Sequence, residues 1–197
     1  MATTSIWPVK GYLGKVVVYI KNPLKTENPE YFEKTDINEY ERQSLSDVIE
    51  YAANNEKTAM RQFVTGVGCS PETAREEMMM VKRIYEKEGG RVGFHGYQSF
   101  AKGEVTPELA HEIGVKLAEE LWGDYFLVVV ATHLDHESHI HTHFVLNSVS
   151  FRDGHRFDNS KADYRKMREA SGRLCREYGL SIIEKPVPGK SKHYSEW

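Results

Sequence analysis

The stretch that decides the fold is HIHTHFVLN, residues 139–147. Successive side chains of an extended strand point to opposite faces, so these residues separate by parity. The even positions are nearly all apolar and predict a face against the core, whereas the odd positions carry imidazoles in place of solvated Lys or Glu. The residues on the odd face are His139, His141, His143, Val145 and Asn147. The stretch therefore predicts a buried strand with a row of histidines along one side.

The chain just before this strand brings another histidine to the same place. Residues 125–132 predict a buried strand and the polar segment 135–138 predicts a turn, so His133 should lie beside His141 and His143. Three imidazoles about one strand spacing apart can bind one cation and leave coordination positions open for a substrate. The pattern therefore predicts a metal site made by these three histidines.

Three further polar residues lie near the predicted metal site. Asp135 is a ligand, an orienting partner or an ordinary turn residue, and the sequence alone does not separate these readings. His139 and Asn147 share the face of the metal-binding histidines and are candidates to orient them.

The rest of the chain alternates strand and helix patterns. Further strands are predicted at 4–10, 62–68 and 92–100, and helices at 12–21, 45–54, 70–88, 106–122 and 163–178. The valine run 16–18 also permits a strand. This order predicts an α+β fold, with a central, mostly antiparallel β-sheet flanked by helices. Residues 1–185 are predicted as one domain with an insertion at about 27–58, and residues 186–197 as a Pro/Gly/Lys linker, so that the chain is expected to be a truncated part of a longer protein.

Composition excludes several classes of protein. Of the 197 residues 40% are hydrophobic, which is enough for a packed core, and no apolar run is long enough to span a bilayer. Only two cysteines occur, so a disulfide framework is excluded, and with no visible leader peptide a cytoplasmic location is predicted.

Charge is unevenly distributed although the net charge is only −3. Residues 1–150 carry 15 basic and 22 acidic side chains, whereas residues 151–197 carry 11 basic and 7 acidic. A local basic patch can bind a polyanion whatever the total charge. The candidates for phosphate contacts are Arg152, Arg156, Lys161 and Arg165, and the alternative is a solvated helix face.

Tyrosines offer a nucleophile that fits the predicted metal site. Two of the eleven occur in a repeated setting in which Asn follows at the third position and Lys-Thr at the sixth and seventh, namely Tyr19 and Tyr51. A tyrosine hydroxyl has a pKa of about 10 and attacks only beside a metal or a base. A cation held by neutral imidazoles keeps its full charge, which suits a phosphodiester transition state.

These residues resemble the conjugative relaxases of the HUH endonuclease superfamily, and most closely their MobP class. His133, followed by His141-Thr142-His143 and then Asn147, is similar to the third motif of that family. Segments around Pro71, 98–107 and 179–183 also resemble this class. The resemblance covers nearly the whole chain.

The resemblance implies a site- and strand-specific DNA nickase that acts by transesterification at an origin of transfer of a plasmid or other mobile element. A tyrosine attacks the scissile phosphate and forms a 5′-phosphotyrosine adduct, while His133, His141 and His143 hold one Mg²⁺ or Mn²⁺ ion. Tyr19 is favoured because it keeps the strand-to-helix order and the following Asn-Pro, and Tyr51 is the alternative because it keeps the spacing to Cys69-Ser70-Pro71. Asp135 is implied as a base for the tyrosine proton.

The resemblance also implies partners. They are single-stranded DNA and the hairpin of the origin of transfer, an accessory mobilisation DNA-binding protein and a coupling ATPase, with no membrane. Gln98 and Ser99 are candidates to line the DNA groove, or are simple edge polar residues. The alternatives are a replication-initiator-type HUH nuclease, a metal-dependent hydrolase and a metal-containing single-stranded DNA-binding module.

Overall fold

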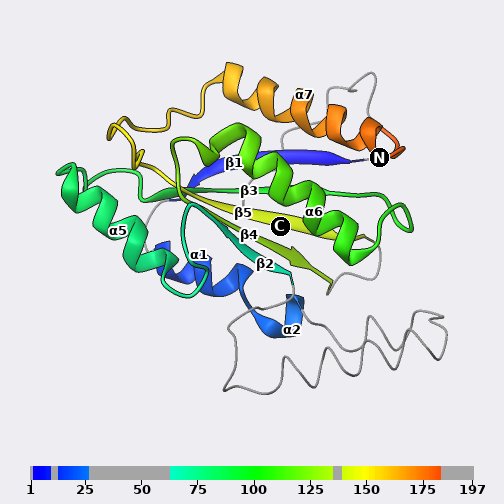
Figure 1. Ribbon diagram of the computed structural model, residues 1–197, viewed down its shortest axis with the longest axis horizontal. Coiled ribbons are helices and arrows are strands. Elements are labelled where there is room, and N and C mark those ends of the chain that lie inside the picture. The colour runs from blue at the N-terminus through cyan, green and yellow to red at the C-terminus, as the bar shows by residue number, and fades with distance from the viewer. Residues whose placement is uncertain (1, 10–12, 27–62, 135–138, 183–197) are drawn as a thin grey trace.

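A five-stranded antiparallel sheet forms the centre of the protein (Figure 1). The computed structural model describes residues 2–9, 13–26, 63–134 and 139–182. The strands are β1 (Thr3–Val9), β2 (Val64–Val67), β3 (Gly93–Ser99), β4 (Val128–His133) and β5 (His141–Asn147), in the spatial order β1-β3-β5-β4-β2. All four neighbouring pairs are antiparallel, so the predicted α+β class and antiparallel sheet are confirmed.

Helices cover both faces of this sheet. They are α1 (Leu13–Ile20), α2 (Pro23–Thr26), α5 (Ala74–Ile84), α6 (Pro107–Ala118), the π-helical turn η1 (Glu119–Gly123) and α7 (Lys161–Glu177). Figure 1 shows α6 crossing in front of the sheet and α7 lying along β1. The valine run 16–18 belongs to α1, so the helical alternative for this segment is the one the structure adopts.

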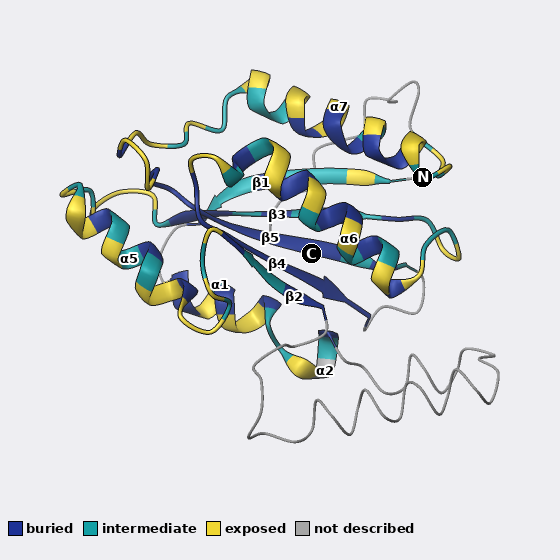
Figure 2. Ribbon diagram, in the orientation of Figure 1, coloured by how far each residue is buried: buried dark blue, intermediate teal, exposed yellow. Residues whose placement is uncertain are grey.

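The two faces have separate apolar cores. On one face Phe144 and Leu146 pack with Ile113, Leu117 of α6 and Met167 of α7. On the other face Val129, Ala131 and Val145 pack with Val17 and Ile20 of α1 and Met78 of α5. Figure 2 shows β4 and β5 buried along their length. The sequence predicted that the even-numbered residues of β5 face the core, and this is only part of the arrangement, because helices also cover the face that carries the histidines.

Local signals explain where most helices begin and end. The Thr106 hydroxyl accepts a hydrogen bond from the Leu109 amide, and Ser160 forms a capping box with Asp163. Gly179 ends α7 at a φ of +70°, which favours glycine. The helix predicted at 70–88 is shorter than expected: the Ser70 hydroxyl donates to Glu72, and α5 begins only at Ala74 and ends at Ile84.

Helix α1 is held over the end of β4 that carries His133. Just after α1, the Lys21 ammonium donates to the Pro71 carbonyl. The Leu134 amide donates to the Lys25 carbonyl of α2 at 2.7 Å. These contacts place the segment that ends α1 beside the first residues after β4.

Some predictions fall outside the described residues. They are the helix at 45–54, the insertion at about 27–58 and the linker at 186–197. Across the ranges that the structure describes, every helix is too short or too polar to traverse a bilayer.

Candidate metal centre

Three histidines converge at the end of β4 and the start of β5. His133 lies directly opposite His141 in the strand register, and His143 is two residues further along the same face. One nitrogen from each ring lies within 4.8 Å of the others. His133 is fully buried, His143 is 7% exposed and His141 is half-buried. The predicted convergence of these three side chains is confirmed as a geometric fact.

Hydrogen bonds orient two of the three rings. The backbone carbonyl of Ile20 accepts a bond from His133 Nε2 at 2.9 Å, so Nε2 carries the proton and Nδ1 carries a lone pair. His143 Nδ1 lies 2.9 Å from His95 Nε2, and His143 Nε2 is buried with no hydrogen-bond partner among the described residues. His143 Nε2 therefore carries an unused lone pair, among the described residues, when Nδ1 is the protonated nitrogen.

Burial keeps His143 neutral. It lowers the pKa of His143 well below its usual value, and the neighbouring charges of His133, His95 and His141 lower it further. Only a neutral imidazole can bind a metal ion, because the protonated ring offers no lone pair. The electrostatics of the site therefore favour the form that coordinates a cation.

The donor set fits one divalent cation. Three imidazoles leave coordination positions for water or substrate oxygens, which is the arrangement of an open rather than a closed metal site. Two nitrogens that bind one ion at about 2.1 Å each are at most about 4.2 Å apart, so the rings would draw together slightly on binding. His143 Nε2, which is buried and has no hydrogen-bond partner in the part of the chain that the structure describes, is the atom that fits this role best.

Sequence reasoning missed His95. Its ring stacks edge-on against Trp7 of β1 at 4.8 Å, and burial lowers its pKa to about 4. In the tautomer of His143 that leaves Nε2 as a ligand, Nδ1–H donates to His95 Nε2, which fixes the ring. The alternation of residues 93–99 places His95 on one face with Tyr97 and Ser99, but only the strand register shows that this face meets His143.

Tyr19 lies next to the histidine cluster. Its ring centroid is 5.6 Å from that of His133 and 6.0 Å from that of His143, both in edge-on geometry. The residue is 47% exposed, and the Lys25 ammonium lies 5.1 Å from the ring centroid. The helix that carries Tyr19 also provides the carbonyl that orients His133, so one element positions both groups.

Three other residues predicted for the site are Tyr51, Asp135 and His139. Tyr51 and Asp135 lie outside the described residues. The ring of His139 is 5.5 Å from that of His141, at the outer side of the cluster.

Two site predictions need correction. Gln98 cannot line a DNA groove, because it is fully buried on the opposite face of the sheet and donates to Ser171 of α7 at 2.8 Å. Asn147 lies on the predicted face but four residues beyond His143, about 13 Å along the strand. Its amide donates to the Met78 carbonyl, so it ties β5 to α5 instead of orienting a metal ligand.

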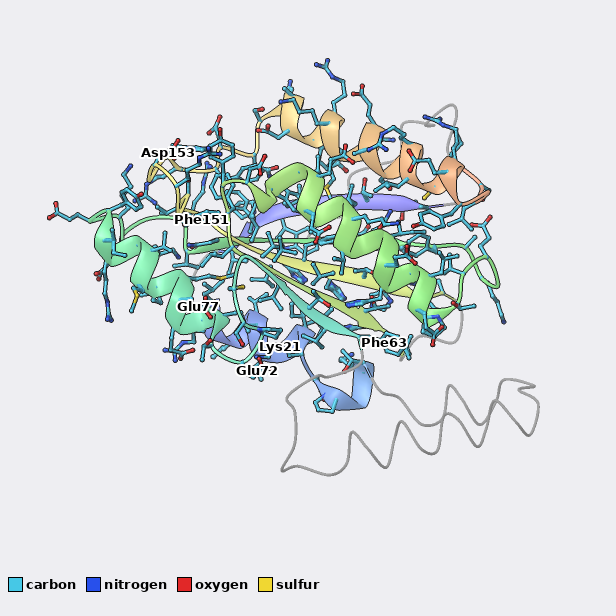
Figure 3. All side chains as sticks on the ribbon, in the orientation of Figure 1. Lys21, Phe63, Glu72, Glu77, Phe151 and Asp153 are labelled. Carbon is cyan, nitrogen blue, oxygen red and sulfur yellow. The ribbon has the colours of Figure 1, made fainter. Side chains whose placement is uncertain are left out.

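The predicted DNA contacts are divided between different parts of the molecule. Ser99 is directly opposite His141 and half-buried, at the edge of the histidine cluster. Arg152 and Arg156 belong to the loop after β5. Two other residues of this loop, Phe151 and Asp153, are labelled in Figure 3 and lie at the opposite end of the sheet from Phe63. Arg156 donates to the carbonyls of Lys87 and Gly89, and Arg152 lies over the Tyr125 ring.

Lys161 and Arg165 are exposed on α7, across the sheet from the histidines. They line a groove of about 660 Å³ between α7 and the start of β1, together with Arg168 and Arg176. Arg165 also forms an exposed ion pair with Glu169 at 3.8 Å. The four basic residues predicted for phosphate contacts are therefore divided between the loop after β5 and the exposed surface of α7.

Comparison with known proteins gives consistent matches. A sequence profile described as "Relaxase: MobA/VirD2-like, nuclease domain" matches residues 51–180. "Protein rlx" of Staphylococcus aureus is 34% identical over 144 residues, covering 73% of this chain and 44% of that protein. The "Group II intron-interrupted relaxase LtrB" of Lactococcus lactis is 30% identical over 204 residues, covering 84% of this chain and 36% of that protein. The chain thus spans less than half the length of the curated relatives it matches.

One solved structure, "Molecular Basis of Vancomycin Resistance Transfer in Staphylococcus aureus", aligns with a TM-score of 0.39 and 17% identity. The alignment covers 52% of this chain and 60% of that chain, and it is too weak to bear on the fold.

Proposed function

This chain belongs to the relaxase family, in the MobA/VirD2-like group of nuclease domains, and we propose that it nicks and rejoins one DNA strand at an origin of transfer. The nick would start conjugative transfer of a mobile element such as a plasmid. The observation that carries the proposal is the position of the Tyr19 ring against His133 and His143. A half-exposed phenol beside three convergent imidazoles is the combination that a tyrosine-dependent nuclease requires.

The proposed reaction is a transesterification. The Tyr19 oxygen forms a bond to the scissile phosphorus, and the bond between phosphorus and the 3′ oxygen breaks. The phenol proton passes to a base, for which we propose Asp135, and the leaving oxygen takes up a proton to become a 3′-hydroxyl. The 5′-phosphotyrosine adduct keeps the phosphodiester bond energy, so the reverse reaction rejoins the strand.

His133, His141 and His143 are proposed as the ligands of one Mg²⁺ or Mn²⁺ ion. When bound, the ion would polarise the scissile phosphate and stabilise the negative charge that develops on it. His95 would hold the His143 ring in its ligating tautomer, and the Ile20 carbonyl would do the same for His133. His139 is proposed as an outer partner of His141.

The proposed substrate is single-stranded DNA with the hairpin of the origin of transfer. Ser99 lies at the edge of the histidine cluster and is proposed to contact the strand near the scissile phosphate. Lys161 and Arg165 are proposed to contact phosphates in the groove beside α7, and Arg152 and Arg156 those at the far end of the sheet. An accessory mobilisation DNA-binding protein, a coupling ATPase and a cytoplasmic location complete the proposal by resemblance to the family.

The experiment compares tyrosine variants in an adduct assay. Wild type, Tyr19→Phe, Tyr51→Phe, the double variant and the control Tyr125→Phe are incubated with Mn²⁺ and oligonucleotides that tile an origin of transfer. Tyr125 is a suitable control because it is 40% exposed and lies just before β4, at the opposite end of that strand from His133. Tyr19→Phe should lower the yield of covalent adduct by at least about 1,000-fold, and the other single variants should retain it. Denaturing gels and intact mass measure the adduct.

Other outcomes select other functions. Loss of the adduct only in Tyr51→Phe would show that Tyr51 is the nucleophile and that the proposal for Tyr19 is wrong. Cleavage without an adduct that survives the double variant indicates a hydrolase with a water nucleophile. Binding without cleavage indicates a DNA-binding module, and global unfolding on chelation indicates a structural metal.

A further inference from the structure

A second polar cluster lies directly behind the histidine triad, on the opposite face of β4 and β5. Thr132 precedes His133 in β4, and Thr142 lies between His141 and His143 in β5. The two threonines face each other in the strand register, and their hydroxyl oxygens are 2.9 Å apart. Both are fully buried, next to apolar side chains such as Val130 and Phe144.

His111 of α6 connects this pair to two further elements. Its Nδ1 lies 3.0 Å from the Thr132 hydroxyl, and its Nε2 lies 2.8 Å from the hydroxyl of Thr65 in β2. The Thr142 hydroxyl donates to the Ala110 carbonyl of α6 at 3.3 Å. The cluster thus joins α6, β2, β4 and β5 at one level of the sheet.

The donor and the acceptor of each hydrogen bond in this cluster can be assigned consistently. Because the Thr142 hydrogen is used on Ala110, Thr142 accepts from Thr132, and Thr132 accepts from His111 Nδ1–H. His111 Nε2 then accepts from the Thr65 hydroxyl. Burial lowers the pKa of His111 to about 4, so the ring is neutral at pH 7, as this arrangement of one donor and one acceptor requires.

The close packing of α6 leaves little freedom at this position. A Cβ on Gly114 would lie only 2.5 Å from Thr142 Cγ2, so the helix backbone rests directly on Thr142. Apolar residues of similar size would pack in the same space without any need for hydrogen bonds. Because buried polar groups are costly unless every bond is made, a complete network at this level indicates a requirement for defined geometry.

We propose that His111, Thr132 and Thr142 are positioning residues that hold β4 and β5 at the separation at which His133, His141 and His143 bind one ion. The inference rests on the metal site of the proposed function. Each threonine is a direct chain neighbour of a ligand histidine, so a change in the spacing of the two threonines moves the imidazoles on the other face. Outer partners of metal ligands typically contribute about 10- to 100-fold to metal affinity.

The test measures Mn²⁺ binding by calorimetry, without DNA. Thr142→Val removes the hydroxyl at similar volume and should weaken Mn²⁺ binding by about 10-fold or more, whereas Thr142→Ser keeps the hydroxyl and should bind as wild type does. The matched control is Ser171→Ala, which removes another buried hydroxyl from the same face, bonded to Gln98. Ser171→Ala should lower stability while leaving the Mn²⁺ affinity unchanged.

A second variant covers the case in which Thr142→Val does not fold. His111→Phe keeps a ring of similar size against Phe63, whose centroid lies 6.0 Å away, and removes both nitrogens of the network. It should weaken Mn²⁺ binding as Thr142→Val does. Wild-type affinity in a folded His111→Phe or Thr142→Val would overturn the positioning proposal. Failure of the wild type itself to bind Mn²⁺ would instead overturn the metal site of the proposed function.

Discussion

Two polar clusters lie back to back on the two faces of β4 and β5, and they use their polar atoms in opposite ways. On one face His133, His141 and His143 bring ring nitrogens within 4.8 Å of one another, and His143 Nε2 is buried without a hydrogen-bond partner in the described part of the chain. On the other face, His111 and the threonines around it bond to one another, and each of their side-chain nitrogens and oxygens has a partner.

Burial therefore does not distinguish a binding site from a structural network. Both clusters lie under helices and both contain residues with no exposed surface. What distinguishes them is whether the lone pairs are used inside the protein. A cluster with lone pairs left over should respond to metal ions, whereas a cluster with all bonds made should respond to conditions that change its protonation.

The largest expected effect is loss of metal binding in His143→Ala. The variant removes the buried Nε2, which has no hydrogen-bond partner within the described ranges, so the affinity for Mn²⁺ should fall by more than about 100-fold. An ion that binds only the folded state stabilises it by mass action, so Mn²⁺ should raise the thermal midpoint of the wild type but not that of the variant. An equal rise in both proteins would show that the ion binds elsewhere.

A smaller effect is expected at the outer partner of the triad. His95→Phe keeps a ring against Trp7 but removes the nitrogen that faces His143. Affinity for Mn²⁺ should fall by about 10- to 100-fold, measured by calorimetry. His95→Gln, which restores an acceptor, is the control and should recover part of the loss. If His95→Phe binds as tightly as wild type, the contact with His143 does not orient the ring.

The smallest effect is expected from the pH dependence of stability that His111 and its hydrogen-bonded cluster contribute. Burial lowers the pKa of His111 from 6.5 to about 4, so between these values the unfolded state binds a proton that the folded state does not. Stability should therefore fall as pH drops through this window, by up to roughly 1.4 kcal/mol per pH unit for one such site. Metal-free wild type should have a lower thermal midpoint at pH 5 than at pH 7.

The contribution of His111 is isolated by comparison with a variant. His111→Phe cannot titrate, so its midpoint should depend less on pH than that of the wild type, even if it is lower at both pH values. An identical pH dependence in the two proteins would mean that other groups are responsible and that His111 is not held neutral by the fold.

Residues whose roles depend on neighbours in the chain were predictable. The alternation of residues 139–147 identifies the histidine face of β5, and the short connection after His133 requires β4 to pair with β5 in antiparallel register. The helix caps at Thr106 and Gly179 are likewise local, since a hydroxyl or a positive φ acts within one turn.

Residues whose roles depend on distant segments were mispredicted or missed. Gln98 and Ser99 are adjacent in β3, yet one is buried against α7 and the other lies at the edge of the histidine cluster. Polar residues look alike in sequence whether they face solvent or a partner more than seventy positions away, as Gln98 faces Ser171. His95 was missed for the same reason, because only the register of β3 against β5 brings it to His143.

The sequence by itself determined the candidate residues and the elements that carry them: three histidines at strand spacing, a tyrosine on a helix followed by Asn-Pro, and a sheet made of alternating segments. Tertiary structure alone decided that Tyr19 lies against His133 and His143, that the basic residues divide between two sites, and that His111 closes a network behind the triad. The physical reason is the distance along the chain over which each interaction acts. Side-chain alternation and capping act over a few residues of the chain, whereas packing of helices on a sheet joins groups that the sequence keeps far apart.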